Sequence, residues 1–191
     1  MKVLIYGLCL LFASSAFGLE KLSEPYLVTY GDLTSGIKIT SYFSFKCPHC
    51  VELFRREFKD IKSQYIESKK ISFTFHPVPM DLLTVQAMAC LERLSDEKKK
   101  IFLEAILEEL DIDDQEFSSI LMEKAMEILG DPVPNLRERS YLSQTTAFNA
   151  AFKFLKQEEE IVALPAVEVN GRLYSEEIPD KDFIEGVLNG L

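Results

Sequence analysis

The stretch from Ile37 to Met80 changes its hydrophobic period twice, and this constrains the fold more than any other feature of the chain. Residues 37–45 (IKITSYFSF) are rich in β-branched and aromatic side chains, which is typical of a strand. From Pro48 onward, apolar residues recur at spacings of three and four, as on one face of a helix: Val51, Phe54, Phe58, Ile61 and Tyr65. Ile71–Met80 again has the strand pattern. This order predicts two parallel strands joined by a crossover helix.

The patterns outside this unit predict an α/β domain with an all-helical insertion. Pro25–Gly31 has a strand pattern, and the stretch of about 82–157 holds about four amphipathic helical segments. Asn170-Gly171, between Ala166–Val169 and Arg172–Ser175, is typical of a tight hairpin turn. Residues 179–191 predict a short closing helix. Because the helical segments lie between strands of one predicted sheet, we expect a single folded domain.

The first eighteen residues have a different composition from the rest of the chain. Lys2 precedes an eleven-residue apolar run, and small residues follow at Ala16 and Gly18. This is the three-part pattern of a secretory signal peptide, which we predict over 1–18, with the mature domain over 19–191. The alternative is an uncleaved N-terminal anchor, although the run is short for a membrane-spanning helix. Export would place the cysteines where disulfides persist.

The charge of the chain argues against one class of partner. The formal net charge is −10, and the hydrophobic fraction of 47% is that of a globular protein. An acidic surface disfavours nucleic acid or an anionic membrane as a partner, so we expect no nucleic-acid binding.

Cys47 and Cys50 lie at the predicted junction between strand and helix, in the sequence Cys-Pro-His-Cys. A thiolate at a helix N-terminus faces free N–H groups, so Cys47 is the candidate nucleophile and Cys50 the candidate resolving thiol. Pro48 suits the first helical turn, and His49 could add positive charge near the Cys47 sulfur. The stabilised thiolate would make the disulfide a strong oxidant.

A metal site and an inert crosslink are the alternative interpretations of this pair. A zinc site needs about four ligands. His49 and His76 are the only histidines, and no second Cys-x-x-Cys exists, so we expect no metal. An inert crosslink would not need a position that opens a helix. Thiol–disulfide exchange is therefore the favoured chemistry.

The segment FSFKCPHC resembles the active-site segment of the DsbA family, the thiol–disulfide oxidases of the bacterial periplasm, and the dipeptide Pro48-His49 is typical of that family. The resemblance covers essentially the whole mature chain and implies a thioredoxin fold with a helical insertion. It also implies a cis-proline at Pro165, facing the dithiol, and a substrate-contacting residue at Leu164. Family members more often have Val or Thr at the Leu164 position. Many also have a buried carboxylate where this chain has Ser41.

The resemblance implies a function and its partners. The expected activity is the introduction of disulfide bonds into reduced or unfolded exported proteins, without a cofactor, by a periplasmic monomer. A DsbB-like membrane protein would reoxidise the enzyme. Leu164 and Ser41 keep open a second possibility, a periplasmic reductase or isomerase. A peptide-binding or chaperone module, in which the dithiol is incidental, is the alternative from another class.

Two other residues have both a structural and a functional interpretation. Cys90 lies on an apolar helical face, which favours a buried core thiol over a third redox cysteine. His76 ends the predicted strand before Pro77, where a structural role is favoured over a catalytic one.

Overall fold

The computed structural model describes residues 24–156 and 163–190 of the chain. The predicted signal peptide lies outside the described residues. Five strands form one mixed sheet among those described: β1 (Val28–Tyr30), β2 (Ile37–Phe43), β3 (Ile71–Pro77), β4 (Ala166–Val169) and β5 (Arg172–Ser175). Their order in the sheet is β1-β3-β2-β4-β5. Only the β2–β3 pair is parallel, as the strand–helix–strand pattern predicts, and the neighbouring pairs are antiparallel.

One long helical segment connects β2 to β3 and packs on one face of the sheet. It begins as α1 (Pro48–Leu53) and continues through the π-helical η2 (Phe54–Phe58), α2 (Lys59–Ile61) and the π-helical η3 (Lys62–Ile66). Its apolar face packs on aromatic side chains of β3. The closing helix α8 (Lys181–Leu188) lies beside it, because Tyr65 donates a hydrogen bond to Glu185 and Lys181 pairs with Asp60.

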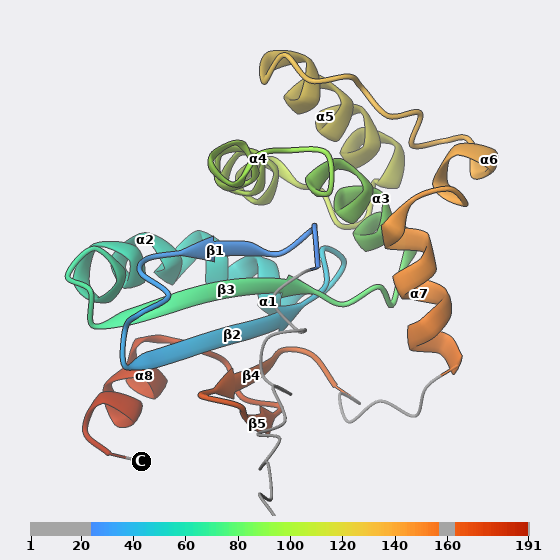
Figure 1. Ribbon diagram of the computed structural model, residues 1–191. Helices are drawn as coiled ribbons and strands as arrows, with labels where there is room; N and C mark the ends of the chain where they lie inside the picture. Colours follow the sequence, from blue (N-terminus) through green and yellow to red (C-terminus); the bar gives the residue numbers. More distant parts are fainter. Residues whose placement is uncertain (1–23, 157–162, 191) are drawn as a thin grey trace, which may run out of the picture.

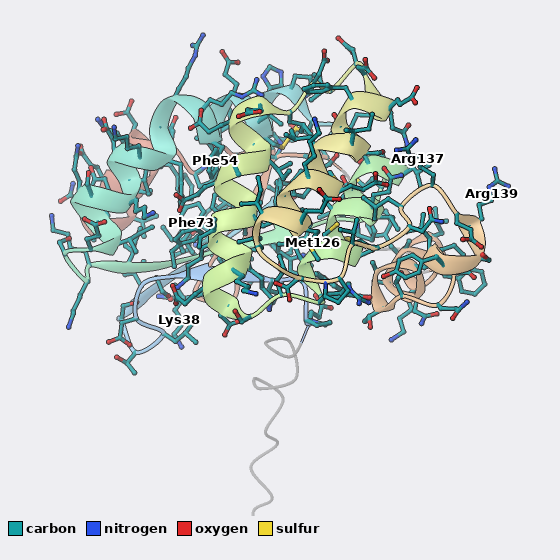
Figure 2. All side chains as sticks on the ribbon, turned by 90° about the horizontal axis from the view of Figure 1, so that it is seen from above. Lys38, Phe54, Phe73, Met126, Arg137 and Arg139 are labelled. Carbon is teal, nitrogen blue, oxygen red and sulfur yellow. A yellow bond between two sulfur atoms is a disulfide. The ribbon has the colours of Figure 1, made fainter. Side chains whose placement is uncertain are left out.

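The helical insertion between β3 and β4 forms a second lobe above the sheet in Figure 1. It comprises α3 (Leu82–Leu91), α4 (Asp96–Glu109), α5 (Gln115–Ile128), the short α6 (Arg139–Leu142) and α7 (Thr146–Lys156). The fourth expected helical segment is thus divided into α6 and α7 by a turn at residues 143–145. Helix α3 is buried from Leu83 to Leu91 and contacts both α5 and α7. Figure 2 shows Met126 inside this lobe, whereas Arg137 and Arg139 lie at its outer edge.

Three of the predicted strands, over 25–31, 37–45 and 71–80, are longer than the observed β1, β2 and β3, whereas β4 and β5 have the predicted bounds. Strand β2 ends at Phe43 because the next residues turn toward α3, and β3 ends at Pro77 instead of Met80. Helix α7 differs in its burial. Phe148, Phe152 and Leu155, which its periodicity places on one apolar face, are 41%, 52% and 79% exposed. The hydrophobic pattern therefore predicts the helix correctly, but it does not predict that this apolar face is exposed.

Candidate active site

Cys47 and Cys50 lie at the start of α1 and form a disulfide, with their Cα atoms 5.3 Å apart. Cys47 is the N-cap residue, with an extended backbone, and Pro48 takes the first helical position. Cys50 follows within the first turn and is only 5% exposed, whereas Cys47 is partly exposed. The two sulfur atoms therefore differ in access: a large reactant reaches Cys47 more readily than Cys50.

The backbone at the start of α1 supplies a hydrogen bond to the outer sulfur. The N–H of Cys50 donates to Cys47 Sγ over 3.3 Å. The first N–H groups of a helix have no partner within the helix, and the helix dipole is positive at this end. When the disulfide is reduced, both effects favour a thiolate at Cys47 over a thiolate at Cys50. Pro48 has no N–H, so it donates no backbone hydrogen bond to either sulfur atom.

His49 lies on the first turn of α1 with its side chain exposed. Within the described part of the chain, the His49 ring forms no hydrogen bond or ion pair. An exposed imidazole beside the outer cysteine can approach either a thiolate or an incoming reactant. Its assistance to Cys47 therefore stays a prediction.

A polar network that the sequence did not reveal holds the turn before Cys47. Ser44 and Thr84 each donate a side-chain hydrogen bond to Asp81 Oδ2, over 2.6 and 2.7 Å. Thr84 Oγ1 also accepts the buried N–H of Phe45 over 2.9 Å, and Ser44 Oγ accepts the N–H of Lys46. Asp81 is itself the N-cap of α3. These hydrogen bonds connect the turn before Cys47 to α3, the first helix of the insertion.

We predict that Thr84→Val destabilises the protein by about 1–3 kcal/mol, because it leaves the buried N–H of Phe45 without an acceptor. Valine keeps the shape of the side chain, so loss of packing contributes little. Urea unfolding monitored by circular dichroism measures the effect. Thr40→Val is the matched control, since Thr40 lies half-buried on β2, and its expected change is within about 0.5 kcal/mol. Equal midpoints for the two variants would show that the network does not hold the turn.

Pro165 and Leu164 lie at the same end of the sheet as the dithiol. The Leu164–Pro165 peptide bond is cis, and Pro165 immediately precedes β4. Because β4 runs antiparallel to β2 and Ala166 pairs with Tyr42, Pro165 is next to the end of β2 that leads to Cys47. Leu164 is partly buried and packs against the apolar clusters on both sides of the sheet. The arrangement is compatible with the expected roles of both residues, which stay predictions.

Ser41 is buried in the middle of β2, at 1% exposure. It pairs in register with Phe75 on β3 and Val167 on β4. It shares a sheet face with Phe43, two residues along the strand. Phe43 and Phe75 pack together, and Phe75 also contacts Phe54 of the helical segment. Ser41 therefore faces the helix that carries the dithiol, and it brings no titratable group there.

We predict that Ser41→Glu adds an ionisation to the pH–rate profile of disulfide exchange. A carboxyl buried at this position has its pKa raised by desolvation, so it titrates closer to neutral pH and can transfer protons to the buried Cys50. The measurement is the rate at which dithiothreitol reduces the Cys47–Cys50 disulfide between pH 4 and pH 9. Ser41→Gln, which has the same size without the charge, should keep the wild-type profile. If the Glu and Gln variants have the same pH–rate profile, then a carboxyl at residue 41 does not take part in proton transfer.

Cys90 and His76 take structural positions. Cys90 is a free thiol with no exposed surface, and burial raises its pKa well above the ordinary range, so it is unreactive in the folded protein. His76 Nε2 lies 2.8 Å from Glu24 Oε2, and the His76 ring packs against Tyr42 and Tyr26. These contacts connect the start of the described chain to β3. Both findings agree with the structural interpretations of the sequence.

No group of three or more His, Cys, Asp or Glu side chains in residues 24–156 and 163–190 is arranged to hold a metal ion. No helix in these ranges is both long and apolar enough to span a bilayer.

Comparison with known families assigns the chain to one class of proteins. The Thioredoxin family model matches residues 23–187, which is most of the chain. The protein therefore belongs to the thioredoxin family, and its helical insertion gives it a DsbA-like fold. No curated protein matches the sequence.

Solved structures support the fold at low sequence identity. DsbA1 of Wolbachia pipientis is 17% identical, with a TM-score of 0.63, over 86% of this chain and 90% of that one. A protein-disulfide isomerase from Novosphingobium aromaticivorans is 12% identical, with a TM-score of 0.64, over 86% and 98% of the chains. Oxidised BdbD from Bacillus subtilis is 19% identical, with a TM-score of 0.60, over 87% and 93%. These similarities concern the fold.

Proposed function

We propose that the protein is a thiol–disulfide oxidoreductase that introduces disulfide bonds into exported proteins through Cys47 and Cys50. The observation that carries the proposal is the position of the disulfide at the start of α1, where Cys47 Sγ accepts the N–H of Cys50. This environment stabilises the Cys47 thiolate, hence the reduced form of the enzyme, and makes the disulfide oxidising. Membership of the thioredoxin family supports the same chemistry.

The reaction consists of two exchanges that balance in electrons. A client thiolate attacks Cys47 Sγ, the more accessible sulfur, and Cys50 leaves as a thiolate. The second client thiolate then attacks the client sulfur of this mixed disulfide, and Cys47 leaves. The client loses two electrons and becomes a disulfide, while the enzyme gains two electrons and, after protonation, becomes a dithiol. Stabilisation of the Cys47 thiolate speeds the second exchange, because a weaker base is a better leaving group.

Residues around the disulfide have supporting roles in this proposal. His49, exposed beside Cys47, would stabilise the thiolate further when it is protonated. Leu164 and Pro165, at the same end of the sheet, would contact the client chain. A periplasmic location and a DsbB-like membrane protein that reoxidises the dithiol complete the proposal. Both follow from the resemblance to DsbA and from the predicted signal peptide.

The reduction potential of the purified protein, equilibrated with glutathione buffers, tests the direction of the reaction. We expect a value near DsbA's, about −120 mV, because the helix start stabilises the dithiol. Reduced ribonuclease A should then gain disulfides when mixed with the oxidised protein. A potential near that of thioredoxin, about −270 mV, would instead indicate a reductase. The first positions to mutate would then be Leu164, where the DsbA family more often has Val or Thr, and Ser41, where many members have a carboxylate.

A further inference from the structure

A pocket of about 840 Å³ lies between α1 and the connection from α4 to α5. It begins at Pro48, the residue next to Cys47, and continues along α1 past Val51. Its opposite wall includes Ile112 and Phe117, and Phe117 is 44% exposed. A volume of this size is within the range of pockets that hold a small ligand or a short piece of peptide.

The arginine side chains in this pocket already have partners. Arg55 donates hydrogen bonds to the carbonyl oxygens of Leu107 and Leu110, over 2.8 and 2.7 Å, and thereby caps the end of α4. Arg56 forms an ion pair with Glu52, one turn away on the same helix, over 2.8 Å. Both guanidinium groups are therefore engaged, and neither forms an ion pair with a carboxylate of the opposite wall.

The opposite wall holds three exposed carboxylates, those of Glu108, Glu109 and Asp111. In the described part of the chain no Lys or Arg side chain lies within ion-pair distance of them. The Asp111 carboxylate accepts hydrogen bonds from the backbone N–H groups of Asp113 and Asp114. Four acidic residues, Glu52, Glu108, Glu109 and Asp111, thus line the pocket against two arginines, so its apolar side chains are combined with a net negative charge.

We propose that this pocket binds the client polypeptide beside its reactive cysteine, and that it favours clients with Lys or Arg near that cysteine. The inference rests on the proposed function and adds a substrate class to it. An apolar client side chain would pack on Phe117 and Ile112, and a client cation would approach Glu108, Glu109 and Asp111. Charge complementarity selects a basic segment, because an acidic one would meet a net negative charge.

The position of the pocket connects it to the exchange reaction. A client held in a mixed disulfide at Cys47 is covalently fixed next to Pro48, which borders the pocket. The residues of the client nearest its cysteine therefore have the pocket within reach throughout the exchange. Attraction by the pocket carboxylates should act mainly on the encounter and so on the second-order rate constant.

The test compares two reduced dithiol peptides that differ only beside the first cysteine, where one has three lysines and the other three glutamates. Each peptide is mixed with the oxidised full-length protein at low salt, quenched with acid and analysed by chromatography. We expect the lysine peptide to react faster. In the variant Glu108→Gln/Glu109→Gln/Asp111→Asn, its rate constant should fall by about three- to tenfold, as expected for the loss of three Coulomb attractions across water.

A second triple variant, Glu67→Gln/Glu127→Gln/Asp182→Asn, controls for the overall charge. It removes three exposed carboxylates that do not line the pocket, so its rate with the lysine peptide should change less than twofold. High salt should abolish the difference between the triple variants, since the screening length falls from about 30 Å at 0.01 M to about 3 Å at 1 M. Equal rates for the two variants at low salt would overturn the inference.

Dithiothreitol separates this inference from the proposed function. Besides its thiols it has no charged or bulky apolar group that could occupy the pocket, so at high salt it should reduce the wild-type protein and both triple variants at the same rate. If both peptides are oxidised at rates that do not depend on the pocket carboxylates, then the proposed role of the pocket is wrong, but the proposed oxidoreductase function still holds. If dithiothreitol reduces the disulfide but neither peptide is oxidised by the wild-type protein, then the proposed function fails, and the inference that rests on it fails too.

Discussion

Replacement of Cys47 by serine is expected to reduce the oxidation of client thiols to the uncatalysed rate. Serine is a good N-cap residue, and its hydroxyl can accept the N–H of Cys50 that Cys47 Sγ accepts now, so α1 should still begin at Pro48. What the variant loses is the only sulfur at the site that a client readily reaches. Formation of disulfides in reduced ribonuclease A, with and without the variant, measures the loss.

The same variant separates the proposed enzyme from a peptide-binding module. Such a module would bind unfolded polypeptide equally well with and without the Cys47→Ser substitution, so peptide binding is measured in parallel with oxidation. Cys50→Ser removes the Cys47–Cys50 disulfide that a client thiolate attacks, so it should also lose the oxidation of reduced ribonuclease A. Cys90→Ala is the matched control and should keep full activity, because Cys90 has no exposed surface. If Cys47→Ser still oxidises its client, then the chemistry does not belong to this pair.

The parts of the fold that the sequence predicts well depend on local chemistry. Pro48 can take only an early position in a helix, and it does so in the structure. Asn170 and Gly171 both have positive φ angles, as the tight turn between β4 and β5 requires. The apolar run of β3 is buried because helices or strands cover it on every side. Each of these features is encoded within a few residues, so a single sequence is enough to predict it.

The parts that the sequence did not predict depend on residues that are far apart in the chain. Thr84 accepts the N–H of Phe45, 39 positions away, and no local pattern distinguishes this threonine from the others. The pocket beside Pro48 joins α1 to Ile112 and Phe117, whose positions depend on how the insertion packs on the sheet domain. Similarly, periodicity defined the apolar face of α7 without showing that Phe148 and Leu155 are exposed. Tertiary packing decides such features.

Phe75→Ala is expected to destabilise the protein by about 3–5 kcal/mol, the largest effect that we predict for any single core substitution. Phe75 is 3% exposed in β3. Its ring contacts five other aromatic rings, at centroid distances between 4.8 and 6.0 Å: Tyr30, Phe43, Phe54, Phe58 and Phe73. These rings come from three strands and from the helical segment, so they cannot all move inward to fill the space that the substitution leaves.

Urea unfolding and the thermal midpoint both measure this loss. For a chain of this size, 1 kcal/mol corresponds to about 2–4 °C, so the midpoint should fall by at least about 6 °C. Phe148→Ala is the matched control, since Phe148 is 41% exposed on α7, and its midpoint should change little. A loss below about 1.5 kcal/mol for Phe75→Ala would mean that the cluster repacks. Because Phe54 and Phe58 attach the dithiol helix to the sheet through this cluster, a repacked cluster would also change how the helix that follows Cys47 is held.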